Sequence, residues 1–172
     1  MSWIITCVLI AFFIYLIYNR IALKLFGVPK SLSMTFYLLQ EKKNWTRIFF
    51  PIMMVSIAFL LLPAWLEISV GSSFQFLAFL AASGILFVGA APAFKSSDLE
   101  NTVHMTSAIA AAIFAILWVI LVSKLWWTLI LWIITLGLTM WITKTIKSSY
   151  IYWLETIAFM STFTSIIAYY LS

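Results

Sequence analysis

Five polar residues of this 172-residue chain have types and spacings suited to chemistry. Asp98, Glu100, Asn101 and His104 lie at the start of one predicted helix, and Glu155 lies about one turn inside the last one. A carboxylate beside an imidazole stabilises the charged ring, which suits a proton relay or the binding of a lipid headgroup. Ionisable groups inside membrane spans are candidates for function. We therefore take these five as ligand-binding candidates and assign no catalytic residue.

The same residues also have a purely structural interpretation. Asp98 and Glu100 in the first turn of a helix complement its dipole, and Ser97 or Asp98 is a suitable N-cap. Glu155 is close enough to a helix end to reach the membrane interface. Both interpretations stay open at this point.

Metal and disulfide chemistry is limited by composition. His104 is the single histidine and Cys7 the single cysteine, and Cys7 lies inside a predicted span. One subunit therefore has neither a multi-histidine zinc centre nor a disulfide framework. We predict no metal site and no cofactor.

The overall composition indicates a membrane protein. Hydrophobic residues make up 65% of the chain and charged residues 9%, which leaves too little polar surface for a soluble globule of this length. No long polar stretch separates the apolar segments. We predict an all-α, polytopic transmembrane helical bundle in which residues 1–172 form a single domain.

A window of about 20 residues, the length that crosses the hydrocarbon core, indicates about six spans. The connection 68–73 is short and predicts an antiparallel hairpin, and the turn at Ser123 and Lys124 is tighter still. The first span continues as helix to Phe26 until Gly27 and Pro29 end it. The predicted spans are 3–18, 48–67, 74–94, 103–123, 125–143 and 151–171.

The basic residues predict the orientation. Nine of the ten Lys and Arg residues fall in the first, third and fifth connections, and Lys124 alone falls on the other side. Loops rich in Lys and Arg are retained in the cytoplasm. We therefore predict a multi-pass inner-membrane protein with both termini on the outer face of the membrane. The net charge of +5 then faces anionic lipid and does not indicate nucleic-acid binding.

The first connection has room for structure of its own. We predict a short interfacial helix near 31–42, capped by Ser31, with Leu32, Phe36 and Leu39 on one face. It would lie on anionic lipid, or it would fold back over the bundle and bring Ser31, Ser33 and Tyr37 to His104. Basic residues beyond it are the predicted contacts to anionic lipid, namely Lys42, Lys43 and Arg47.

Small residues recur at helical spacing in the third and fourth predicted spans. Such stripes let helix backbones approach closely. We expect ordinary helix packing from them, with a narrow ligand crevice as the alternative. In the fourth span the stripe comprises Ser107, Ala108, Ala111, Ala112 and Ala115.

Two short motifs resemble a broad group of uncharacterised prokaryotic six-helix membrane proteins. The first contains Pro29, Ser31, Ser33, Phe36 and Tyr37, and the second contains Asp98 and His104-x-x-x-Ala108. That group has no assigned reaction, so the resemblance implies the topology and points to Ser31, Ser33, Tyr37, Asp98 and His104 without implying a substrate. The repeated histidines of ceramidase-like and progestin-receptor-like membrane hydrolases are not in this sequence.

Three classes of function remain. We rank first a noncatalytic protein that binds a lipid headgroup or a protein partner through the cytoplasmic polar cluster. A small proton-coupled transporter or channel using His104 and Glu155 ranks second, and an intramembrane hydrolase ranks last because His104 has no evident nucleophile partner. The predicted partners are membrane lipids and either a second copy of the chain or another membrane protein.

Overall fold

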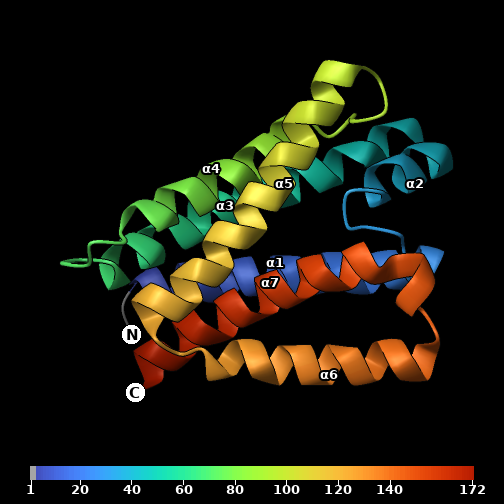
Figure 1. The fold of residues 1–172 in the computed structure, drawn as a ribbon. Coiled ribbons are helices and arrows are strands. Elements are labelled where there is room, and N and C mark those ends of the chain that lie inside the picture. Colours follow the sequence, from blue (N-terminus) through green and yellow to red (C-terminus); the bar gives the residue numbers. More distant parts are fainter. Residues whose placement is uncertain (1–2) are drawn as a thin grey trace.

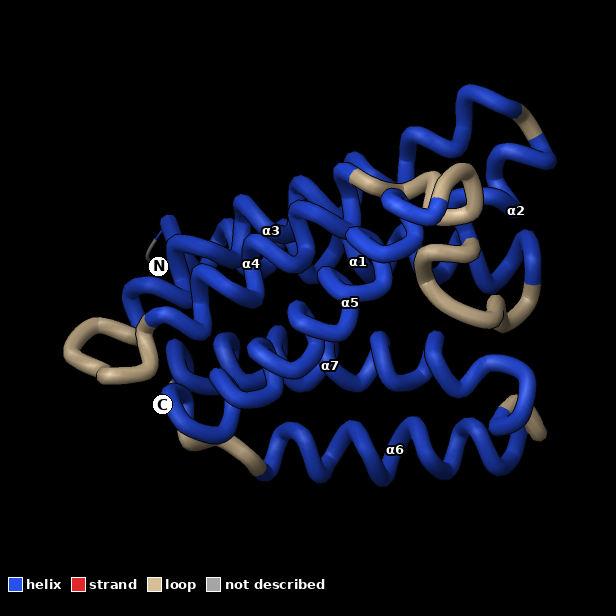
Figure 2. The backbone as a smooth tube through the Cα atoms, turned by 45° about the horizontal axis from the view of Figure 1, so that its top comes forward, coloured by secondary structure: helices blue, strands red, loops and turns tan. Residues whose placement is uncertain are grey.

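The computed structural model describes residues 3–172, and the described residues form helices joined by loops, without a strand (Figures 1 and 2). The α-helices are α1 (Trp3–Phe26), α2 (Thr35–Lys42), α3 (Phe49–Ile68), α4 (Phe76–Ala90), α5 (Asp98–Trp118), α6 (Trp127–Thr143) and α7 (Ile146–Leu171). Besides its α-helices the chain has two short helical turns, the 3-10 turn η1 (Asn44–Ile48) before α3 and the π-helical turn η2 (Val119–Ser123) after α5.

The prediction of an all-helical fold is confirmed for the described residues. Four segments of the described chain are long and apolar enough to cross a membrane, and α4 and α6 are apolar but shorter, with 15 and 17 residues. The number of spans and the side of the termini stay predictions. The four long segments are Trp3–Phe26, Asn44–Ile68, Asp98–Ser123 and Lys147–Leu171.

The helices pack as two groups that α1 joins. In one group α4 lies between α3 and α5, and in the other α6 lies along α7 (Figure 1). Helix α1 packs against both α3 and α7. The start of α1 and the end of α7 lie at one end of the molecule, and α2 lies at the other (Figure 1). We call the end with α2 the basic end, because nine of the ten Lys and Arg residues lie in the connections that meet there or in the helix ends beside them.

Helix α1 continues to Phe26, as predicted, and stops at Gly27. The Gly27 φ of 70° is in the left-handed region, and its N–H donates to the Leu23 carbonyl at 3.0 Å. Glycine adopts this conformation without the cost that a Cβ brings, which is why it ends many helices. The chain therefore leaves the helix axis just before Pro29.

Small residues bring α4 and α5 into close contact. A Cβ placed on Gly84 would lie 2.8 Å from the Ala111 Cβ and from its backbone nitrogen. Only a residue without a side chain fits between the two backbones here. At this position the small-residue stripe of the fourth predicted span serves helix packing, because Ala111 of that stripe contacts Gly84 of α4.

Helices α5 and α6 are separate, as the predicted turn at Ser123 and Lys124 requires. The π-helical turn η2 extends α5 to Ser123, and Lys124 has a left-handed φ of 58°. The Ser123 hydroxyl donates to the Val119 carbonyl and accepts from the Leu125 N–H. The chain reverses within these few residues and enters α6.

The short helix of the first connection, α2, begins at Thr35, four residues after the predicted cap. Ser31 still accepts a hydrogen bond from the Met34 N–H at 3.1 Å, but it closes a turn that precedes the helix. Leu32, Phe36 and Leu39 are all buried in the structure. Their shared face therefore packs against the bundle.

Candidate functional site

Residues 27–34, which we call the strap, cross the basic end of the molecule between helices. In Figure 1 α5 and α7 diverge toward the basic end, and the strap lies in the space between them. Backbone carbonyls of the strap accept hydrogen bonds from α7, at Val28 from the Ser149 hydroxyl and at Lys30 from the Tyr152 N–H, each at 3.2 Å. The strap is thereby held to the last helix of the chain.

The Glu155 carboxylate binds the middle of the strap. Its Oε2 atom accepts a hydrogen bond from the Leu32 N–H at 2.6 Å. A hydrogen bond from a backbone N–H to a carboxylate is stronger than a neutral pair. Leu32 precedes α2, so its buried N–H has no partner within a helix, and Glu155 supplies the acceptor.

His104 binds the next strap residue. Its Nε2 atom lies 2.8 Å from the Ser33 Oγ, and its Nδ1 atom lies 2.8 Å from the Ala91 carbonyl oxygen. Because a carbonyl only accepts, Nδ1 is the protonated nitrogen, and in the neutral ring Nε2 accepts from the Ser33 hydroxyl. The Phe94 ring stacks on the imidazole with a centroid distance of 4.7 Å. Ser33 is 4% and His104 2% exposed, so the pair is sealed from solvent.

A serine hydroxyl that donates to an oriented imidazole is also the arrangement of an activated nucleophile. Ser33 reaches His104 as one of the two predicted placements of the first connection requires, although the sequence did not identify it as a nucleophile. In the described structure both imidazole nitrogens already have partners and both side chains are buried. The geometry therefore serves as an anchor for the strap.

Tyr37 lies beside the His104 pair without touching it. Its hydroxyl accepts from the Lys95 N–H at 2.6 Å, and its ring packs edge-on against Phe94 at 5.2 Å. The Lys95 Nζ lies 4.6 Å from the centroid of the Tyr37 ring. Tyr37 therefore ties α2 to the loop between α4 and α5.

Three other predicted site residues stay outside this cluster. Asp98 and Asn101 are exposed at the start of α5, and the backbone N–H of Glu100 donates to the Ser97 hydroxyl at 3.2 Å. Ser97 is the N-cap of α5, as the structural interpretation predicts. His104 and Glu155 do come together indirectly, because they bind the consecutive strap residues Ser33 and Leu32.

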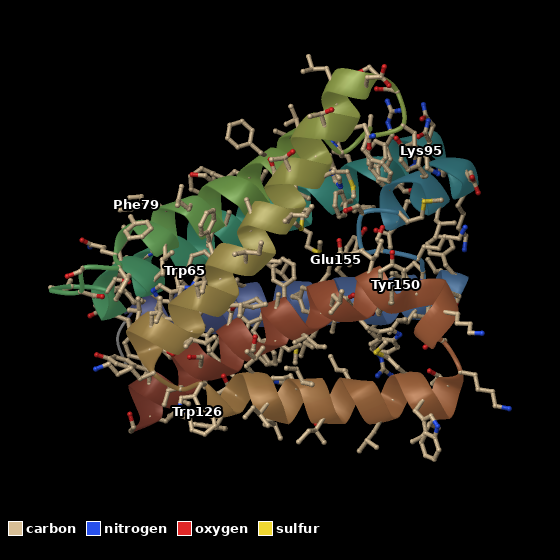
Figure 3. The ribbon with its side chains drawn as sticks, in the orientation of Figure 1. Trp65, Phe79, Lys95, Trp126, Tyr150 and Glu155 are labelled. Carbon is tan, nitrogen blue, oxygen red and sulfur yellow. The ribbon has the colours of Figure 1, made fainter. Side chains whose placement is uncertain are left out.

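A narrow cavity lies directly behind the strap. It has a volume of about 50 Å³ and extends from Leu32, Ser33 and Glu155 to Trp65. Figure 3 shows Glu155 toward the basic end and Trp65 toward the opposite end. One wall is the small-residue stripe of α5, comprising Ala108, Ala111, Ala112 and Ala115.

A second, larger hollow opens on the surface beside α1. This groove has a free volume of about 730 Å³ between α1, α2 and the start of α3. Its walls are apolar, and Lys42, Lys43 and Thr46 lie at its basic end. Lys43 Nζ is 5.4 Å from the Trp45 ring centroid, and the Arg47 guanidinium is 5.9 Å from that of Phe36. The apolar lining includes Ile14, Ile17, Ile21, Leu25, Phe49 and Ile52.

Several contacts of the basic end have no signal in the sequence. The Tyr18 hydroxyl and the Thr35 Oγ1 are 2.5 Å apart, and the Tyr152 hydroxyl donates to the Asn19 Oδ1 at 3.1 Å. Tyrosines near helix ends are expected in interfacial belts in any case. Their hydroxyl partners become visible only once the helices are placed side by side.

No family model, no curated protein and no solved structure matches the chain. The resemblance to prokaryotic six-helix membrane proteins therefore stays a prediction.

Proposed function

We propose that this chain is a six-span inner-membrane protein, with both termini outside, that binds an anionic phospholipid without catalysis. The lipid headgroup lies at Lys42 and Lys43, and an acyl chain lies in the groove between α1 and α3. The single observation that carries the proposal is that one groove combines a long apolar wall with two lysines at its basic end.

The shape of the groove supports a lipid rather than a soluble anion. Ile17, Ile21 and Ile52 in its walls are each more than half exposed, so they present apolar surface to the membrane. Burying such surface against a chain is favourable where a water-soluble anion would leave it uncovered. Each lysine near a membrane surface adds roughly 1 kcal/mol of attraction to acidic lipid.

The test compares two double variants with the same loss of charge. Lys42→Gln/Lys43→Gln removes the lysines of the groove, and Lys144→Gln/Lys147→Gln removes a pair beside a depression that is otherwise lined by Trp141 and Ile142. Each purified variant is reconstituted in nanodiscs with phosphatidylcholine and a small fraction of phosphatidylglycerol. Bound phosphatidylglycerol is then counted by native mass spectrometry.

We expect the groove variant to bind phosphatidylglycerol roughly thirtyfold more weakly than the unchanged protein, the combined effect of two lysines at about 1 kcal/mol each. The Lys144/Lys147 control is expected to lose much less, because only two apolar residues, Trp141 and Ile142, line its site. An equal loss in both variants would mean that charge alone attracts the lipid and that the groove is not a binding site.

A further inference from the structure

Helix α2 joins the strap to the lysines of the groove. It begins at Thr35, directly after the strap, and it ends at Lys42, with Lys43 as its C-cap. A helix of 8 residues has only about two turns, so a shift at Thr35 displaces both lysines as well. The placement of the headgroup site therefore depends on what holds the strap.

Two hydrogen bonds in series connect the wall of the groove to the strap. Tyr18 lines the groove, and its hydroxyl lies 2.5 Å from the Thr35 Oγ1. The Thr35 hydroxyl in turn donates to the Leu32 carbonyl at 2.6 Å. Because a carbonyl only accepts, Thr35 uses its single hydrogen there, and Tyr18 is the donor in the other bond. Thr35 is 0% and Leu32 2% exposed, so water does not compete for these contacts.

Leu32 is bound from its other side by α7. Its N–H donates to the Glu155 Oε2 at 2.6 Å, while its carbonyl accepts from Thr35. Glu155 lines the cavity behind the strap and is not among the described residues that line the groove. A change at Glu155 therefore reaches the groove through Leu32 and Thr35.

We propose that Tyr18, Thr35 and Glu155 are positioning residues of the lipid site, and that an anionic lipid in the groove fixes the strap over the bundle. This inference rests on the proposed function, because it concerns the same groove. The headgroup holds α2 at its lysines and the acyl chain covers Tyr18, and both effects favour the bonded strap. Coupling of this kind is reciprocal, so the factor by which the lipid stabilises the strap equals the factor by which the bonded strap tightens the lipid.

The binding of phosphatidylglycerol tests the role of Glu155, in the same nanodiscs and with the same native mass spectrometry. Glu155→Leu removes the acceptor of the Leu32 N–H, and we expect about three- to tenfold weaker binding, the effect of one lost hydrogen bond. Glu155→Gln keeps an acceptor and is expected to restore most of the affinity. Glu67→Leu is the matched control and is expected to bind normally, because Glu67 also accepts an interhelical hydrogen bond, from Tyr170, but at the opposite end of the molecule.

Hydrogen exchange of the strap amides tests the coupling in the reverse direction. At a saturating fraction of phosphatidylglycerol, we expect exchange in the unchanged protein to be about three- to tenfold slower than in phosphatidylcholine alone. Thr35→Val removes the hydroxyl between Tyr18 and Leu32, so this slowing is expected to fall below about twofold. Thr139→Val is the control and keeps the slowing, because its hydroxyl donates only to a carbonyl of its own helix, α6.

The outcomes separate this inference from the proposed function. Equal loss of lipid in Glu155→Leu and Glu67→Leu would overturn the coupling, because general destabilisation would explain both. Unchanged binding in Glu155→Leu would overturn it as well, even where Lys42→Gln/Lys43→Gln loses the lipid and so confirms the groove. Equal loss in that lysine variant and its Lys144/Lys147 control would instead show that the groove is not the lipid site, and both proposals would fail.

Discussion

Leu32 and Ser33 are neighbours in the chain, yet two different helices hold them. Glu155 of α7 accepts from the Leu32 N–H, and His104 of α5 accepts from the Ser33 hydroxyl. Each bond satisfies a polar group in a region with little water, where an unpaired group is costly. At the scale of single residues, these two bonds determine where the strap lies.

The first prediction compares two serines of the strap. Ser33→Ala leaves the Nε2 of the buried His104 without its donor, and we expect a loss of about 1–3 kcal/mol in the free energy of unfolding. Ser31→Ala removes an acceptor that serves only the local Met34 N–H in a partly exposed turn, so its expected loss is smaller. Thermal unfolding of both variants in nanodiscs measures the difference. Equal stability of the two variants would show that the His104 contact adds nothing to the strap.

At the scale of elements, the close contact of α4 and α5 depends on the absence of a side chain at Gly84. A Cβ at that position meets the Ala111 backbone as well as its side chain, so rotation of a flexible side chain cannot relieve the clash. The two helices would have to move apart. The wall of the cavity would move with them, because α5 supplies the alanines of that wall.

The second prediction follows from this contact. Gly84→Ala is expected to destabilise the protein by about 1–3 kcal/mol through overpacking. Gly137→Ala in α6 is the matched control, because a Cβ there meets nothing within 4 Å and alanine favours a helix. Unfolding by heat or by denaturing detergent distinguishes the two. If Gly84→Ala is as stable as the control, α4 and α5 are not held at this distance.

Local sequence patterns predicted where the helices lie in the chain, but they did not predict which helices pack against one another. Hydropathy locates a helix because lipid requires about 20 apolar residues, and Gly27 ends α1 because a left-handed φ suits glycine. The side-by-side placement of α1 and α7 has no such local signal. The sequence left two placements open for the first connection, either on the lipid surface or folded over the bundle. The spacing of its apolar residues is compatible with both placements. The contact of Ser33 with His104 spans 71 positions and required the tertiary structure.

At the scale of the whole molecule, the two ends of the bundle are closed in different ways. The basic end is covered by the strap and α2. At the opposite end the Tyr170 hydroxyl donates to the Glu67 Oε2, which joins the last turn of α7 to the last turn of α3. No local pattern predicts this contact, because the two residues are 103 positions apart in the chain.

The third prediction concerns topology and uses single cysteines in a Cys7→Ala background. With six spans and external termini, Ser73→Cys and Ser172→Cys react with an impermeant maleimide added to intact cells. Asn44→Cys and Ser96→Cys react only after the cells are permeabilised. All four positions are exposed in the structure. Reaction of Ser96→Cys in intact cells would mean that the short helix α4 does not cross the membrane.

The bonds of the strap to α7 also impose an order on the synthesis of the protein. Leu32 emerges from the ribosome 123 residues before Glu155, its hydrogen-bond partner. Until the last helix is inserted, the Leu32 N–H must be satisfied by water or by the translocation machinery. The strap therefore cannot take its final position during the insertion of α1 to α6, and the first loop to be made is among the last parts of the protein to become fixed.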